Sequence, residues 1–293
     1  MFGLGAALLQ SVSYLFSALF ISRYQTGAVP HLILVHVVIG ALSLLLLPFL
    51  WHPLAADFSA YGGALISTAV CYLFAQYSLY QAIRHSVASR VSPLLGLKVL
   101  VLAFLGSVFL GQEYLGIQWL AVGLCFLGAL WLSASGGRIS GAALAWVVAA
   151  CCGYALSDLS ILYLMQYFSS LPLLKASMLS VTLCFLLCGL GSVVMLPRLK
   201  QRHLLLASSP AAICWLLAMG CLFACFSELG VVFGGIVQSS RGLISILLAL
   251  LLAYIGLDFA DPVPARKILA QRLLASVLMM LAIIVFALGS ELG

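Results

Sequence analysis

The chain of 293 residues is 65% hydrophobic and only 7% charged, so it lacks the polar surface that a water-soluble globular protein needs. Its 13 basic and 7 acidic residues give a net charge of +6, which is too sparse for a nucleic-acid-binding surface and is typical of charges at the ends of membrane-spanning helices. Composition therefore predicts a polytopic membrane protein and excludes nucleic acid as a partner.

Ten stretches have the length of about 20 apolar residues that a membrane-spanning helix needs. Loop-forming sequences such as GQEYLG and LDFADPVPARK separate them, and the weakest separation is GGIVQ at residues 234–238. We therefore expect an all-α integral membrane protein with ten transmembrane helices, at residues 2–22, 31–50, 60–82, 89–110, 115–134, 141–164, 172–196, 211–235, 238–256 and 270–289.

Basic residues are distributed unevenly among the connections between these predicted helices. The even-numbered connections carry only Lys175 and Arg241. Because basic loops remain in the cytoplasm, the odd-numbered connections are expected on the cytoplasmic side and both termini on the other side. The odd-numbered connections carry Arg23, Arg84, Arg90, Arg138, Arg198, Lys200, Arg202, Arg266, Lys267 and Arg272.

A short repeated sequence suggests that the chain has two related halves. GAAL occurs at residues 5–8 and again at residues 141–144, and each copy opens a set of five predicted helices. We therefore expect two five-helix repeats, residues 1–137 and 138–293. An odd number of helices in each repeat turns the second repeat upside down in the membrane, which is the inverted-repeat architecture of secondary transporters.

Three ionisable side chains lie well inside the predicted spans: Lys98, Asp158 and Glu228. A charge at this depth opposes membrane insertion by about 3 kcal/mol, so it normally faces protein, water or a partner. One interpretation is a static ion pair between Lys98 and one of the acids. The other is a transport cavity, in which Lys98 attracts an anionic group while Asp158 or Glu228 exchanges a proton or meets a cationic group.

Polar side chains recur at every fourth position in the third predicted helix, which places them on one face of that helix. The first predicted helix has a shorter column that includes Tyr14, and in the sixth Tyr154 precedes Asp158 by one turn. In lipid such a column leaves hydrogen-bond donors unmatched, so it should face a cavity or another helix. Interhelical hydrogen bonding is the alternative role for these columns. The candidates for a substrate or ion site among them are Tyr14, Tyr72, Gln76, Tyr80 and Tyr154.

The remaining polar and reactive residues predict no chemistry of their own. All nine cysteines lie in apolar runs without ligand partners, so we expect no metal site, and no phosphate-binding glycine motif or cofactor motif is present. Arg241 and the histidines, His36 among them, are expected at the membrane interface. The absence of a nucleophile, base or metal cluster argues against an enzyme.

The run from Val87 to Leu132 resembles the most recognisable segment of the EamA branch of the drug/metabolite transporter superfamily. Pro93 near the start of a helix and Leu110-Gly111-Gln112-Glu113 at its end carry the resemblance. It implies ten helices around a central cavity, lined mainly by helices 1, 3, 4, 6, 8 and 9, that moves small metabolites or drugs. The better-known ten-helix members have cytoplasmic termini, and the branch commonly has Glu-Pro where this chain has Lys98-Val99, so the substrate class is not inherited.

Together these features predict a secondary transporter, an exporter or exchanger, in the bacterial cytoplasmic (inner) membrane. It is expected to move a small metabolite, such as an amino acid or a related zwitterion or anion, by alternating access around a cavity near the midplane. A proton or other ion gradient would supply the energy, and the assembly would be a monomer or homodimer. The alternatives are a lipid-carrier flippase of the same superfamily and a non-transporting membrane scaffold whose internal charges pair off.

Overall fold

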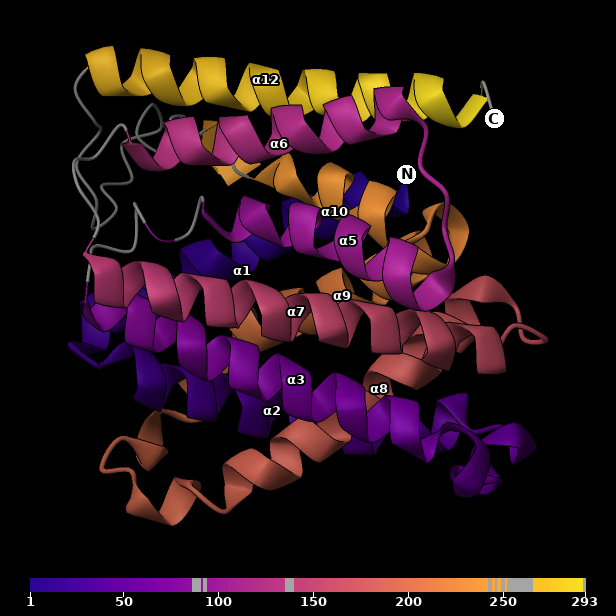
Figure 1. The fold of residues 1–293 in the computed structure, drawn as a ribbon. Coiled ribbons are helices and arrows are strands. Elements are labelled where there is room, and N and C mark those ends of the chain that lie inside the picture. Colours follow the sequence, from indigo (N-terminus) through magenta and orange to yellow (C-terminus); the bar gives the residue numbers. More distant parts are fainter. Residues whose placement is uncertain are drawn as a thin grey trace.

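A computed structural model describes residues 1–85, 91, 94–134, 140–241, 244, 245, 247, 248, 251 and 266–291. All regular secondary structure in these ranges is helical, which confirms the all-α class (Figure 1). The α-helices are α1 (Phe2–Tyr24), α2 (Ala28–Leu50), α3 (Phe58–Arg84), α5 (Lys98–Leu110), α6 (Gly116–Ala134), α7 (Gly141–Tyr167), α8 (Leu173–Val193), α9 (Ser209–Leu229), α10 (Val231–Ser239) and α12 (Arg266–Glu291). Short 3-10 helices precede α3, α5 and α9.

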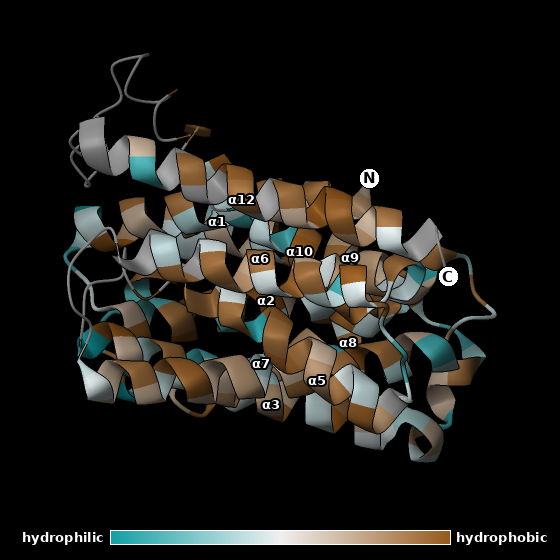
Figure 2. Cartoon of the chain, turned by 45° about the horizontal axis from the view of Figure 1, so that its top comes forward, coloured by the Kyte–Doolittle hydropathy of each residue, from teal (hydrophilic) through white to brown (hydrophobic). Residues whose placement is uncertain are grey.

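Six helical segments within the described residues are long and apolar enough to cross a membrane: Phe2–Tyr24, Ala28–Leu50, Phe58–Arg84, Gly141–Tyr167, Leu173–Val193 and Leu206–Leu229. Large apolar side chains are exposed along the outside of these helices, for example Leu44, Leu45 and Phe49 on α2. Figure 2 shows hydrophobic residues along the length of the helices and hydrophilic residues mainly near their ends. Outward-facing apolar surface of this kind is suited to lipid.

The helix boundaries differ from the predicted ones in two places that matter for the interior. The eighth predicted helix, 211–235, ends earlier, because Gly230 interrupts it with a φ of 75° that favours glycine. As a result Gln238, expected in a connection, lies inside α10. Lys98, expected in mid-helix, is the first residue of α5 and follows the 3-10 turn Leu95–Leu97. Pro93 and most of the predicted ninth helix lie outside the described residues.

Each of the most extensive helix contacts joins the first half of the chain to the second half. These contacts pair α3 with α7, α2 with α8, α1 with α9 and α6 with α12. Figure 1 shows α3 beside α7 and α6 beside α12, with α5 and α10 between these two pairs.

Two glycines set the distance between α2 and α8. A Cβ atom added to Gly40 would lie 2.7 Å from the Cα atom of Gly189, and one added to Gly189 would lie 2.5 Å from the Cα atom of Gly40. Both neighbouring atoms belong to the backbone, so they cannot move aside by a side-chain rotation. Small residues at such a crossing let two helices approach closely within a membrane. We call this contact the α2–α8 seam.

Candidate functional site: a charged cavity between the two halves

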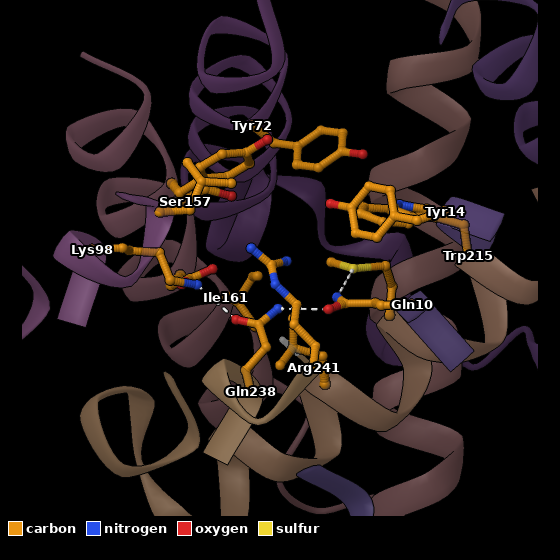
Figure 3. A pocket seen from close by; sticks show the side chains of 14 residues that line it. Gln10, Tyr14, Tyr72, Lys98, Ser157, Ile161, Trp215, Gln238 and Arg241 are labelled. Carbon is orange, nitrogen blue, oxygen red and sulfur yellow. Dashed lines mark hydrogen bonds and ion pairs between the residues drawn. The ribbon is translucent and has the colours of Figure 1, made fainter. Parts of the chain in front are cut away.

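A cavity of about 40 Å³ lies between α1, α3, α5, α7, α9 and α10. This volume is room for a few waters. Figure 3 shows side chains from both halves of the chain pointing into it. The polar lining residues are Gln10, Tyr14, Tyr72, Lys98, Tyr154, Ser157, Asp158, Trp215, Gln238 and Arg241.

Lys98 is the centre of a polar network that crosses the cavity. Its Nζ atom lies 2.7 Å from Oδ2 of Asp158 on α7 and donates a hydrogen bond of 2.8 Å to Oε1 of Gln238 on α10. The Gln238 amide in turn donates to Oε1 of Gln10 on α1 at 3.1 Å. Lys98 is only 9% exposed and Asp158 only 5% exposed. The network therefore connects α5, α7, α10 and α1 through buried side chains.

The ion pair explains how the lysine is accommodated inside the helix bundle. Removing two charges from water carries a penalty of several kcal/mol for each ion, which their attraction offsets only when the geometry is close and the remaining hydrogen bonds are made. Gln238 supplies such a bond to Lys98, and the ammonium also lies 6.0 Å from the centre of the Phe226 ring. Loss of either charge would leave the other buried without a counterion.

Aromatic side chains form one wall of the cavity. The rings of Tyr14 and Trp215 meet edge to face with their centres 5.6 Å apart, and those of Tyr72 and Tyr154 are 6.3 Å apart. Such contacts favour packing between helices and present flat apolar surfaces with polar edges. The wall therefore presents aromatic faces and polar edges to the cavity.

Tyr72 also connects the cavity to α2. Nδ1 of His36 lies 2.8 Å from the Leu32 carbonyl oxygen, which only accepts, so Nδ1 carries the proton of a neutral ring. Nε2 of His36 therefore accepts from the Tyr72 hydroxyl at 3.2 Å, and that hydroxyl accepts from Nε2 of Gln76 at 3.0 Å. The expectation that His36 lies at the membrane interface is wrong: the side chain is 2% exposed inside the bundle.

The candidate residues fall into three groups by position. Tyr14, Tyr72, Lys98, Tyr154 and Asp158 line the cavity together. Gln76 lies behind the cavity wall, hydrogen-bonded to Tyr72, and Tyr80 is half-buried further along α3. Glu228 is exposed in the last turn of α9 and is not among the lining residues.

Five polar lining residues were not among the predicted site residues: Gln10, Ser157, Trp215, Gln238 and Arg241. Gln10 shares the column of Tyr14, so its spacing could have indicated it. Gln238 was hidden by the misplaced helix boundary. Arg241 was expected at the membrane interface, and this expectation is wrong because the residue lines the cavity.

Comparison with known proteins finds a family similarity in the first half of the chain. The EamA-like transporter family matches residues 1–134. No curated protein matches the chain. A solved structure named only as "Crystal structure of protein" is 16% identical and aligns over 98% of both chains with a TM-score of 0.57, so the two share a fold. The chain is therefore a multi-pass membrane protein whose residues 1–134 match the EamA-like transporter family.

Proposed function

We propose that this protein is a secondary transporter with ten membrane spans in two inverted five-helix repeats, residues 1–137 and 138–293. It moves a small metabolite through the central cavity by alternating access, as an exporter or exchanger driven by a substrate or ion gradient. The halves rock against each other, and the cavity is exposed to one side of the membrane at a time. The observation that carries the proposal is the buried ion pair between Lys98 and Asp158, which joins the two halves inside a cavity that both halves line.

The pairing of helices supports the repeat. If α7, α8, α9 and α12 are the counterparts of α1, α2, α3 and α6, exchanging the two halves converts the pair of α3 and α7 into the pair of α9 and α1. The same exchange maps the pair of α2 and α8, and that of α6 and α12, onto themselves. The most extensive contacts are these four pairs, as a two-fold relation between the halves requires.

In this mechanism the ion pair is a contact that changes during transport. Lys98 stands at the start of α5, directly after a 3-10 turn, and interruptions of this kind often mark hinges. Gln238 lies in α10, the helix that begins directly after the one-residue break at Gly230. A shift of α5 or α10 therefore alters the contacts of the ammonium without distorting a long continuous helix.

Uptake into proteoliposomes tests the proposal. Amino acids, drugs and phosphorylated metabolites are offered with and without a pH gradient, to liposomes that contain the protein, its Asp158→Asn variant or no protein. We expect at least one compound to accumulate faster with the wild-type protein than with either control. The proposal would be contradicted if no compound in the screen were taken up, or if the Asp158→Asn variant took up compounds as fast as the wild-type protein does.

We further propose the bacterial cytoplasmic membrane as its location, with both termini on the non-cytoplasmic side. The ten basic residues on the odd-numbered connections support this orientation, whereas the better-known ten-helix members of the superfamily support the opposite one. A reporter that is active only in the cytoplasm, fused after Gly293, distinguishes the two. An active reporter would reverse the proposed orientation.

A further inference from the structure

Arg241 brings a second positive charge into the cavity. It follows α10 directly, is half-buried, and its guanidinium points toward the middle of the cavity between Lys98 and Tyr14 in Figure 3. An arginine side chain stays protonated in proteins, so this charge is permanent. Its guanidinium carbon lies 5.8 Å from the centre of the Tyr14 ring.

The charges that line the cavity do not balance. Two of the described lining residues are cationic, Lys98 and Arg241, and one is anionic, Asp158. Asp158 is already paired with Lys98 at 2.7 Å, and within the described part of the chain no acidic side chain forms an ion pair with Arg241. The cavity therefore carries one positive charge in excess, and this charge belongs to Arg241 rather than to Lys98.

A second hydrogen-bond donor in the same wall has no acceptor. The indole N–H of Trp215 is buried without a hydrogen-bond partner among the described residues, and the residue is only 8% exposed. An indole nitrogen can only donate, and a buried donor that makes no hydrogen bond is unfavourable because it has lost its hydrogen bond to water. Tyr14 packs against both Trp215 and Arg241, so the two donors occupy one region of the cavity.

We propose that Arg241 and Trp215 form the anion subsite of the transported molecule, which is a monoanionic organic acid. Its carboxylate accepts from the Arg241 guanidinium and the Trp215 indole N–H. Its apolar body packs against Tyr14, Tyr72 and Tyr154 once movement of the halves widens the cavity beyond its present room for a few waters. A monoanion balances the excess charge, whereas a zwitterionic amino acid leaves it unbalanced, since the one acid of the cavity is already paired. This inference rests on the proposed transport function and names the substrate class for the same cavity.

Three planar probes of similar size separate charge from shape: benzoate is an anion, benzamide is neutral and benzamidine is a cation. Binding to the purified full chain in detergent is followed by thermal unfolding and by tryptophan fluorescence. We expect benzoate to raise the unfolding temperature and to bind at least about tenfold more tightly than either other probe, because hydrogen bonds between charged groups are the strong ones.

Variants then assign the binding to the two residues. Arg241→Gln should weaken benzoate binding more than about tenfold and abolish the preference for benzoate over benzamide. Arg241→Lys should keep part of the benzoate affinity, since lysine retains the positive charge but lacks the planar guanidinium that donates two parallel hydrogen bonds. Trp215→Phe should weaken benzoate binding by about threefold to tenfold and leave benzamidine unaffected. Arg198→Gln, at an exposed arginine outside the cavity, is the matched control and should change nothing.

The inference is overturned if benzamidine binds as tightly as benzoate, if benzoate fails to bind, or if Arg241→Lys and Arg241→Gln, both still folded, bind benzoate as the wild-type protein does. Transport is measured separately, as uptake of labelled benzoate into proteoliposomes. Selective binding without uptake would leave the anion subsite in place and contradict the transport function. Uptake of other compounds without selective binding of benzoate would contradict the anion subsite and leave the transport function in place.

Discussion

The cavity and the α2–α8 seam both join the two halves of the chain, but by opposite means. At the seam two glycine backbones touch, and a single Cβ atom has no room. In the cavity long polar side chains meet across space that can hold a few waters. Backbone contact fixes a distance, whereas side-chain pairs can exchange partners. In a protein whose halves rock, the seam is thus suited to be the pivot and the cavity to be the part that opens.

The strongest test of this contrast is Gly40→Val at the seam. Its Cβ atom would meet the backbone of Gly189, which cannot move aside, so we expect loss of folded protein. Even overpacking against flexible side chains costs about 1–3 kcal/mol. Yield and size-exclusion profile in detergent measure the effect. The control is Gly63→Val on α3, where an added Cβ has no neighbour within 4 Å; equal yields of the two variants would contradict a tight seam.

The next largest effect is expected at the ion pair. Lys98→Met leaves Asp158 buried without its counterion and should lower the free energy of unfolding by about 3–5 kcal/mol. The double variant Lys98→Met with Asp158→Leu removes both charges and should recover most of this loss. Thermal unfolding measures both, and Lys200→Met, at an exposed position, is the control.

Transport by the double variant then separates the two roles of the ion pair. A static pair only fixes helix packing, so the restored variant would also transport. If instead the ion pair breaks and re-forms during the transport cycle, it is required for function. We therefore expect the double variant to be stable but inactive in transport. Uptake at the wild-type rate would assign Lys98 to packing alone.

A smaller effect is expected where the seam and the cavity are connected. His36→Phe removes the acceptor of the Tyr72 hydroxyl but keeps a ring of similar shape. Hydrogen bonds between membrane helices contribute about 0.6 kcal/mol on average, so the stability loss should be of this order. A double-mutant cycle with Tyr72→Phe measures the coupling between the two side chains. Strictly additive losses would mean that the hydrogen bond contributes nothing.

The smallest effect is expected for Glu228→Gln. The side chain is exposed at the end of α9 and does not line the cavity, and surface substitutions of this kind usually stay within about 0.5 kcal/mol. Both thermal stability and uptake should match the wild-type protein. A loss of uptake comparable to that of Asp158→Asn would place Glu228 in the transport pathway after all.

Much of the architecture could be predicted from the chain because apolar length and loop residues report directly on membrane helices. The all-helical class and most helix positions follow from such local signals. The cavity also gathers the residues of the polar columns, such as Tyr14 and Tyr72, because a column that cannot face lipid must face inward.

The predictions that were wrong or incomplete concern features that depend on three-dimensional context. Gly230 reads as one more small residue in an apolar run, and only its backbone angle shows that a helix ends there. Arg241 stands near the start of a predicted span, where sequence position alone favours the interface, and its direction depends on how α10 packs against α1 and α5. The partner of Lys98 could not be chosen between two acids, because helix adjacency decides the choice.

The ion pair also has a consequence for how the chain is made. Synthesis proceeds from the N-terminus, so Lys98 enters the membrane before α7 brings Asp158 and long before α10 brings Gln238, 140 residues later. Until then its charge opposes insertion. The first half is therefore an incomplete unit during biogenesis, and its lysine must be sheltered by the insertion machinery or remain near the water interface until the second half emerges.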